Sequence, residues 1–207
     1  MKKAMCITYE VDSGLYVNMT NRCSNACTFC IRNNGDGAYG SDSLWLEREP
    51  TVSEVLDSVF ARDLSKYSEI VFCGYGEPSY RLTDAREVAL KIKEKYPNII
   101  IRINTNGHSD LILGCDSAPF YENAFDIVSV SLNTPSPVRY NELCRPRFEC
   151  AHAAMIKFAS RVKTYVPKVL LSVVRQTLSE DELDECRAIA DRIGVHLKIR
   201  DYIPPEP

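Results

Sequence analysis

A regular alternation of short apolar runs with longer amphipathic segments restricts this chain to few architectures. Strand-like runs begin near residues 15, 69, 99, 127, 169 and 195. Helical patterns lie at about 51–66, 82–96, 136–144, 149–164 and 179–193, with a short helical or loop segment at about 117–124. Strands that alternate with helices are typical of βαβ units, whose right-handed crossovers build a parallel sheet. The pattern therefore predicts an α/β fold, either an open sheet or an incomplete barrel.

The N-terminal end of the pattern is a predicted β-hairpin. Two alternating runs, 6–11 and 15–20, flank the turn residues Asp12, Ser13 and Gly14. The second run leads directly into a turn-rich segment that contains three cysteines. The residues that follow, 31–50, are rich in glycine and lack a periodic apolar pattern. A loop this long in a compact domain is often a lid or a binding loop.

Capping boxes mark two of the helix starts. Thr51 is followed three residues later by Glu54, and Ser179 by Glu182. At 207 residues with 45% hydrophobic content, the chain is long enough to bury a substantial core. No interior linker or internal repeat is visible, so we expect a single domain over residues 1–207.

Several predicted strands alternate polar with apolar residues, whereas fully buried parallel strands normally read as continuous apolar runs. The polar positions are Asn18, Thr20, Arg22, Arg102, Asn104, Ser129, Ser131, Asn133, Ser172, His196, Lys198 and Arg200. If these faces converge, they line the inside of a splayed barrel. The alternative places them on exposed edge strands, but agreement among five strands favours the first interpretation.

Three cysteines, Cys23, Cys27 and Cys30, lie within eight residues of one another. A structural zinc site usually takes four protein ligands from two CxxC pairs, and no second pair with that spacing is present. A cubic iron–sulfur cluster held by three thiolates would instead keep one iron open for a reacting ligand. Residue spacing alone leaves zinc, inert thiols and an iron–sulfur cluster as alternatives.

The remaining composition indicates a reduced, cytoplasmic setting. The nine cysteines are odd in number and mostly dispersed, which favours metal binding or catalysis over a disulfide framework. The sequence has neither a secretory signal pattern nor an apolar run of about 18 residues that could span a membrane. A net charge of −3 gives no strong nucleic-acid signal.

The motif Cys23-x-x-x-Cys27-x-x-Cys30, with Phe29 before the last cysteine, resembles the cluster loop of radical S-adenosylmethionine (SAM) enzymes. The surrounding sequence, including VFCGYGEP, IRINTNG and the SxN pair Ser131 and Asn133, resembles that of the radical SAM proteins associated with TatD nucleases. The resemblance covers essentially the whole chain, and its motifs follow in the right order. It implies a partial (βα)6 TIM-like barrel that begins with the β-hairpin.

The resemblance also implies roles for individual residues. Cys23, Cys27 and Cys30 would ligate three irons of a 4Fe–4S cluster, and the amino and carboxylate groups of SAM would chelate the fourth iron. The other implied cofactor-binding residues are Phe29 near the adenine, Gly74, Tyr75, Gly76 and Glu77 as acceptors for an ammonium group, and Asn104, Ser131, Asn133 and Arg200 at the ribose or the carboxylate. Tyr75 stands where the family motif often has its first glycine.

By the same resemblance, the cluster reductively cleaves SAM to a 5′-deoxyadenosyl radical, which abstracts hydrogen from an unidentified substrate. A flavodoxin- or ferredoxin-like donor would supply the electron, and the family suggests a functional link to a TatD-type nuclease. The alternative is a non-catalytic iron–sulfur or zinc-binding module that serves as an accessory or electron-transfer protein. Such a carrier has no need of the GEP, TNG and SxN motifs, so the enzyme is favoured.

Two further expectations concern the interior. Arg22, Arg102, Lys198 and Arg200 would make the channel positive, which favours an anionic substrate with a carboxylate or phosphate group. Cys73, on an apolar run before Gly74, is expected to be a small core residue. Four other thiols are expected to be structural or solvent-exposed, and an auxiliary cluster is the less favoured alternative: Cys115, Cys144, Cys150 and Cys186.

Overall fold

Seven strands pair in chain order to form one sheet in the computed structural model, which describes residues 2–202. The strands are β1 (Thr8–Val11), β2 (Gly14–Val17), β3 (Glu69–Phe72), β4 (Ile100–Thr105), β5 (Ile127–Ser131), β6 (Lys168–Val174) and β7 (His196–Arg200). The first pair is antiparallel, and every later pair is parallel. The predicted fold, a partial (βα)6 barrel with an N-terminal hairpin, is confirmed.

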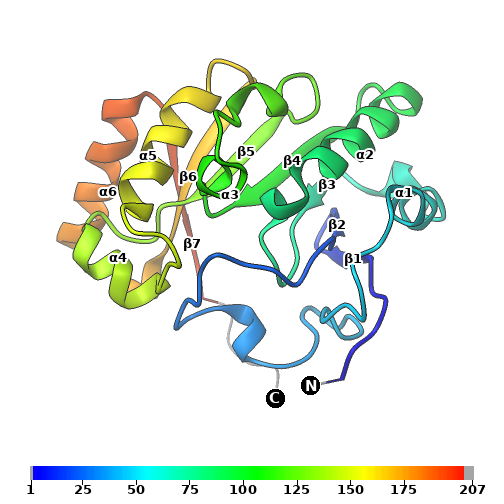
Figure 1. Cartoon of the computed structure of the whole chain (residues 1–207), viewed down its shortest axis with the longest axis horizontal. Helices are drawn as coiled ribbons and strands as arrows, with labels where there is room; N and C mark the ends of the chain where they lie inside the picture. The colour runs from blue at the N-terminus through cyan, green and yellow to red at the C-terminus, as the bar shows by residue number, and fades with distance from the viewer. Residues whose placement is uncertain (1, 203–207) are drawn as a thin grey trace.

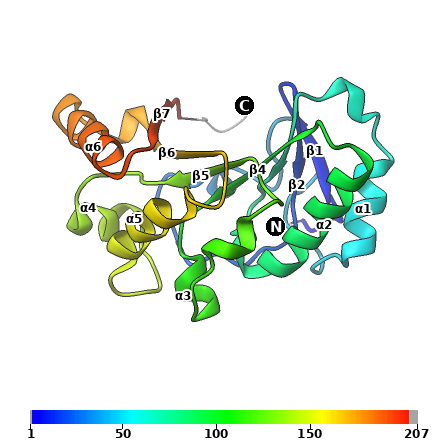
Figure 2. The same ribbon diagram turned by 90° about the horizontal axis from the view of Figure 1, so that it is seen from above.

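Helices pack along the outer face of this curved sheet (Figures 1 and 2). They are α1 (Val52–Phe60), α2 (Leu82–Lys95), α3 (Ser109–Leu113), α4 (Pro137–Cys144), α5 (Ala151–Val162) and α6 (Glu180–Ile193). The capping boxes predicted for Thr51 and Ser179 are both formed. The first helix is shorter than predicted because the side chain of Asp63 caps a separate 3-10 turn, Leu64–Lys66.

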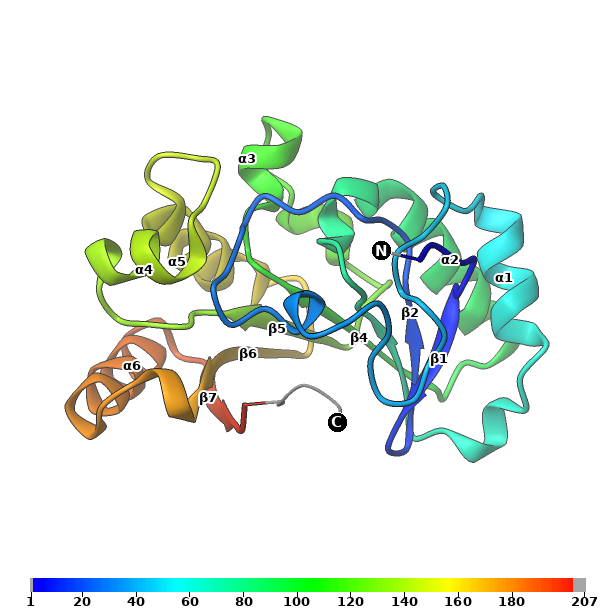
Figure 3. The ribbon, with the colours of Figure 1, turned by 90° about the horizontal axis from the view of Figure 1, so that it is seen from below.

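The core lies between the sheet and the helices. Ile101, Ile103, Val128 and Val130 point to the helical side and are fully buried. Because side chains alternate along a strand, their neighbours on β4 and β5 point to the opposite, inner face. The segment between β2 and α1 runs across the strands on this side and reaches the end of α4 (Figure 3).

The polar-face prediction is correct for β4 to β7, except at His196, but wrong for the first strand, which ends at Val17. Asn18 donates to the carbonyl oxygens of Cys6 and Leu44, and Thr20 donates to Glu49. His196 is exposed at the sheet edge rather than inside. In the described part of the chain, no helix has the length and apolar character needed to cross a membrane.

Candidate active site

The inner face of the sheet encloses a cavity of about 450 Å³ near the carboxyl ends of the strands. The predicted site residues that line it are Cys23, Cys27, Phe29, Cys30, Gly74, Tyr75, Glu77, Asn104, Ser131, Asn133 and Arg200. Ligand sites in α/β folds are commonly built at this end of the strands, where loops from several crossover units meet. Residues from distant parts of the sequence therefore share one cavity.

Backbone hydrogen bonds fix the cysteine-bearing loop to the end of α4. The amide of Ala26 donates to the Cys144 carbonyl and that of Thr28 to the Leu143 carbonyl, both at 2.9 Å. The Arg147 amide donates to the Ser24 carbonyl at 2.8 Å. Within residues 2–202, no three His, Cys, Asp or Glu side chains are gathered as the ligands of a single metal ion.

A buried hydrogen-bond network connects this loop to the end of β4. His108 is fully buried; its Nδ1 lies 3.0 Å from Ser24 Oγ and its Nε2 lies 3.2 Å from Tyr140 Oη. Asn106 Nδ2 donates to the same Ser24 hydroxyl, and Asn25 Nδ2 donates to Tyr140. Burial lowers the pKa of His108 to about 4, so the imidazole is neutral at pH 7.

Burial favours the protonated form of all three loop thiols. Burial, with a smaller effect from Glu77, raises the pKa of Cys23 to about 12. A hydrogen bond with Cys144, together with burial, raises the pKa of Cys27 strongly, and burial raises that of Cys30. A metal that binds these sulfurs must therefore displace protons.

Two glycines bring the turn after β3 against the segment that precedes the cysteines. A Cβ on Gly74 would lie 2.1 Å from Asn18 Oδ1, and a Cβ on Gly76 would lie 2.2 Å from the Thr20 carbonyl oxygen. Both approaches are closer than any side chain permits. Gly76 does not line the cavity, and its part in the structure is this close packing.

Tyr75 holds the long 31–50 loop over the cavity. Its hydroxyl donates to the carbonyl oxygens of Gly35 at 3.0 Å and Gly37 at 2.7 Å. Its ring meets the edge of Trp45 at a centroid distance of 5.2 Å, so Trp45 is a packing anchor for the loop. The loop contributes Tyr39 and other residues to the cavity wall, as expected for a binding loop.

The carboxylate of Glu77 is buried and engaged by the protein. One oxygen accepts from the amide and hydroxyl of Ser79 and from Thr105 Oγ1, and the other accepts from the Asn106 amide at 2.7 Å. Burial raises the pKa of Glu77, although these hydrogen bonds oppose the shift. Glu77 thus joins the ends of β3 and β4 while still facing the cavity.

Three asparagine side chains in the cavity wall carry unsatisfied oxygens. Oδ1 of Asn25, Asn104 and Asn133 is buried without a hydrogen-bond partner in the described residues. Asn133 also has a left-handed backbone, with φ of 63°. Buried polar atoms normally find partners, so these oxygens favour a ligand that carries donors such as hydroxyl or ammonium groups.

The four basic residues predicted for the interior differ in their ion-pair partners and in whether they line the cavity. Arg102 forms a bidentate pair with Glu69, and Arg22 pairs with Glu49 away from the cavity. Lys198 and Arg200, on β7, line the cavity, and no hydrogen bond or ion pair within the described residues engages either side chain. The predicted positive interior therefore reduces to one wall formed by β7.

The opposite wall contains residues that the sequence did not single out. Tyr9, Tyr16 and Tyr39 line it, and Cys73 faces the cavity rather than the core, which corrects its expected place. The cause is strand parity: Phe72 points to the helices, so the next side chain points inward.

The other cysteines are dispersed. Cys115 and Cys150 are exposed, and Cys186 is buried in α6. Cys144 alone among the four lies against the cysteine loop. None of the four lines the cavity.

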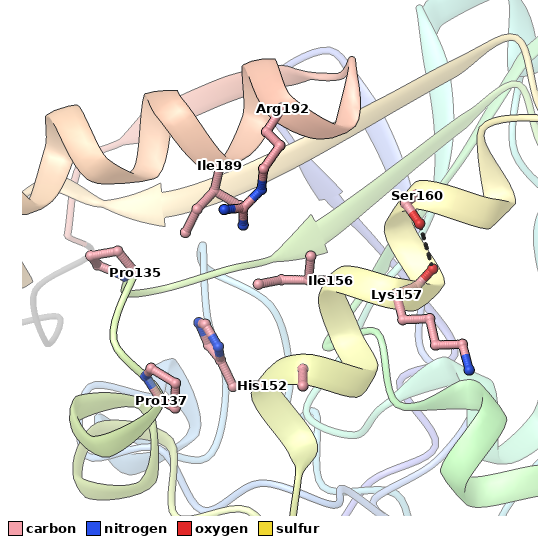
Figure 4. A pocket seen from close by; sticks show the side chains of 9 residues that line it. Pro135, Pro137, His152, Ile156, Lys157, Ser160, Ile189 and Arg192 are labelled. Atoms are coloured by element: carbon pink, nitrogen blue, oxygen red, sulfur yellow. Dashed lines mark hydrogen bonds between the residues drawn. The ribbon is translucent and has the colours of Figure 1, made fainter.

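A separate groove of about 550 Å³ lies on the helical side of the molecule (Figure 4). Pro135, Pro137, His152, Ile156 and Ile189 contribute to its lining. His152 is buried there and its Nε2 lies 3.0 Å from the Thr134 carbonyl oxygen. The groove contains none of the predicted site residues, so the inner cavity is the candidate site.

Comparison with known proteins relates the whole architecture to one family. The profile of the Radical SAM superfamily matches residues 17–190. A radical SAM methyltransferase from Sphaerobacter thermophilus has a TM-score of 0.69 at 18% identity, over 97% of this chain and 59% of that one. Streptococcus suis SuiB bound to precursor peptide SuiA has a TM-score of 0.65 at 16% identity, over 92% of this chain and 39% of that one.

A third solved structure, anSMEcpe with bound AdoMet, has a TM-score of 0.62 at 18% identity, over 92% of this chain and 51% of that one. The chain therefore spans about two fifths to three fifths of the length of these proteins. A search of curated proteins finds no match.

Proposed function

Because the chain belongs to the radical SAM superfamily, we propose that its inner cavity binds a 4Fe–4S cluster and SAM and that the chain is a radical SAM enzyme. The observation that carries the proposal is the convergence of three loop thiols and three unsatisfied asparagine oxygens on one cavity. Structures of two relatives in fold, anSMEcpe and SuiB, are described with bound AdoMet or S-adenosylmethionine.

The residues fit these groups by their chemistry. Cys23, Cys27 and Cys30 supply three thiolates once their protons are displaced, and the cavity leaves room beside them for a polar ligand. When bound, the cluster and SAM supply a one-electron reductive cleavage that yields a 5′-deoxyadenosyl radical. The loop over residues 31–50 shields the cavity from water on the side of Tyr75.

The polar residues of the strand ends orient SAM. Asn104, Ser131 and Asn133 offer acceptors and donors for the ribose and carboxylate, and Phe29 offers an apolar surface for the adenine. The turn at Gly74 and Tyr75 faces the cavity and supplies backbone carbonyls for the ammonium group. The carboxylate of Glu77 is already bound by several donors, so it chiefly fixes that turn.

The substrate is an anion recognised by the β7 wall. Lys198 and Arg200 present unpaired positive charge to the cavity, whereas the charge of Arg102 is neutralised by Glu69. Arg200 also serves the carboxylate of SAM, because it lines the same cavity as the three loop cysteines. A carboxylate or phosphate group on the substrate would meet Lys198.

Two partners complete the proposal. A flavodoxin- or ferredoxin-like protein donates the electron, as reductive cleavage requires a one-electron donor. The motif resemblance described above supports membership of the radical SAM group associated with TatD nucleases, and a TatD-type nuclease as a functional partner. Co-purification of the chain with such a nuclease from cells that express both would test this link.

Anaerobic reconstitution of the full chain with iron and sulfide tests the central proposal. The wild type should bind about four irons per chain, and dithionite should then drive 5′-deoxyadenosine formation from SAM. Cys27→Ala should lose both the cluster and the cleavage, while Cys115→Ala, an exposed thiol outside the cavity, should retain both. A stable zinc protein that leaves SAM intact would support the non-catalytic alternative and refute the enzyme.

The proposal that the β7 wall binds an anionic substrate can be tested in the protein without its cluster. Inorganic phosphate, used as the probe, should raise the unfolding temperature of the cluster-free wild type more than that of Lys198→Met. Lys157→Met is the matched control, because Lys157 is an exposed lysine on α5 outside the cavity. Equal shifts in all three proteins would contradict a phosphate- or carboxylate-binding wall.

A further inference from the structure

A tight turn in the long loop holds one aromatic side chain at the cavity on an unfavourable backbone. The Ser41 amide donates to the Ala38 carbonyl oxygen at 3.1 Å, and the two residues between them, Tyr39 and Gly40, have φ of 57° and 71°. Positive φ at both central positions is typical of a type I′ turn, which favours glycine, asparagine and aspartate. Gly40 fits this preference, but Tyr39 does not, because bulky side chains rarely adopt a left-handed backbone.

Core packing does not explain a tyrosine at this position. Tyr39 is 43% exposed, whereas the preceding Ala38 is buried. The loop is fixed by another side chain, Tyr75, whose hydroxyl donates to Gly35 and Gly37 and whose ring packs on Trp45. Backbone strain that packing does not require is characteristic of residues that contact a ligand.

The cavity wall beside Tyr39 is aromatic. Tyr9 and Tyr16, on the two hairpin strands, line the cavity with Tyr39. The rings of Tyr9 and Tyr16 are tilted by 49° with centroids 5.3 Å apart, and the Tyr9 hydroxyl donates to the Cys73 carbonyl oxygen at 3.2 Å. Aromatic rings pack favourably on one another in tilted or offset arrangements. This wall therefore suits a ligand that carries an aromatic ring.

Tyr16 lies deeper in the cavity than the residues proposed to bind SAM. It is level with Arg102 across β3, and Arg102 Nη2 donates to its hydroxyl at 3.4 Å. Arg102 precedes Asn104 by two residues on β4, which corresponds to about 7 Å along the strand. Because the proposed SAM contacts begin at Asn104 and continue at the carboxyl ends of the strands, the tyrosine wall is left for the substrate.

We propose that Tyr39 is a substrate-binding residue that contacts an aromatic ring, so that the substrate is an aromatic carboxylate or phosphate. The inference rests on the proposed function, in which Lys198 binds the anionic group of the substrate. Lys198 is on β7 and Tyr16 is on the hairpin, and these elements form opposite edges of the sheet (Figure 3). A substrate between them would have its charge at Lys198 and its ring at Tyr16 and Tyr39.

Ligand affinity and unfolding temperature of the cluster-free chain together test this role. By titration calorimetry, the wild type should bind phenyl phosphate about two- to tenfold more tightly than cyclohexyl phosphate, a ligand of similar size without an aromatic ring. Tyr39→Phe should keep this preference. Tyr39→Asn should lose it and yet unfold at a higher temperature, because asparagine suits a left-handed backbone. A retained preference, or a lower unfolding temperature, in Tyr39→Asn would overturn the proposal.

Two further variants serve as controls. Tyr67 lies outside the cavity and has an ordinary φ of −109°, so Tyr67→Asn should keep the preference without a rise in unfolding temperature. Phe29→Ala should also keep it, and its loss there would place the phenyl ring in the SAM site and refute the role of Tyr39. A chain that cleaves SAM but shows no preference would refute this inference alone. A chain that shows the preference but takes up no iron would refute the proposed radical chemistry.

Discussion

Nδ1 of His108 lies 3.0 Å from the Ser24 hydroxyl, although 84 positions separate the two residues in the chain. The contact joins the cysteine loop to the end of β4, and Tyr140 on α4 completes it from the other side of the ring. The imidazole is fully buried, so its neutral state is part of the folded structure. The shape of the cysteine loop thus depends on a titratable group.

This burial predicts a pH dependence of stability. The pKa of His108 falls from 6.5 to about 4 on folding, which corresponds to about 3 kcal/mol at roughly 1.36 kcal/mol per pKa unit. The unfolded chain takes up this proton first as the pH falls. The contribution is therefore complete above pH 6.5 and is lost as the pH drops toward about 4.

Urea unfolding between pH 7 and pH 5 measures the effect. We expect His108→Gln to show a shallower loss of unfolding free energy with falling pH than the wild type. Some slope should remain because burial also lowers the pKa of His152. His196→Gln, at an exposed position, should keep the wild-type slope. A slope for His108→Gln equal to that of the wild type would show that His108 does not cause the pH dependence of the unfolding free energy.

Glu77→Gln should destabilise the fold by about 3 kcal/mol. The carboxylate accepts four hydrogen bonds from Ser79, Thr105 and Asn106, and an amide would turn a donor toward at least one of those donors. Urea unfolding at pH 7 measures the loss. Glu87→Gln, which removes only an exposed pair with Lys91, should cost less than about 0.5 kcal/mol. Similar values for the two variants would contradict a structural role for the Glu77 carboxylate.

Gly76→Ala should displace the turn after β3 and lower both stability and iron uptake. The new methyl group would lie 2.2 Å from the Thr20 carbonyl oxygen and 2.8 Å from that of Arg22, so the backbone must move. We expect a loss of about 1–3 kcal/mol, as for other overpacked sites. Gly35→Ala is the control, because its nearest atom would be 3.8 Å away. Unfolding curves and iron content of both variants would reveal the difference, and a Gly76→Ala protein like the wild type would refute the packing argument.

Tyr75→Phe should loosen the 31–50 loop without unfolding the domain. The variant keeps the ring contact with Trp45 but loses the hydrogen bonds to Gly35 and Gly37. Amide hydrogen exchange should accelerate in residues 31–50 and stay unchanged in the strands. Tyr67→Phe removes an exposed hydrogen bond to Glu10 on the hairpin, so it should leave exchange in the loop as it is. Unchanged exchange in the Tyr75→Phe loop would mean that other contacts hold it.

Local patterns were sufficient to predict most of the framework. Capping boxes place the starts of α1 and α6, because those hydrogen bonds involve residues only three positions apart. Strand parity predicts which side chains of β4 to β7 face inward, since it depends on the pleat alone. The same rule fails at Asn18, because the chain leaves the sheet after Val17.

The electrostatic partners in the interior could not be predicted in the same way. Arg102 is neutralised by Glu69 on the neighbouring strand, and this pairing depends on strand order and register. The packing of Cys144 against the cysteine loop depends on where α4 ends relative to that loop. His108 follows a recognisable TNG motif, yet its partners Ser24 and Tyr140 come from remote segments. Such relations arise only after the elements have packed.

The backbone anchoring of the cysteine loop has a consequence for how the protein matures. Amides at Ala26 and Thr28, and the carbonyl of Ser24, are already paired with the α4 region by hydrogen bonds that involve no metal. In small zinc domains, by contrast, metal binding supplies the free energy of folding itself. Here the polypeptide bears the entropic cost of ordering the loop. Under the proposed function, a cluster would therefore enter a loop whose backbone the fold already holds in place.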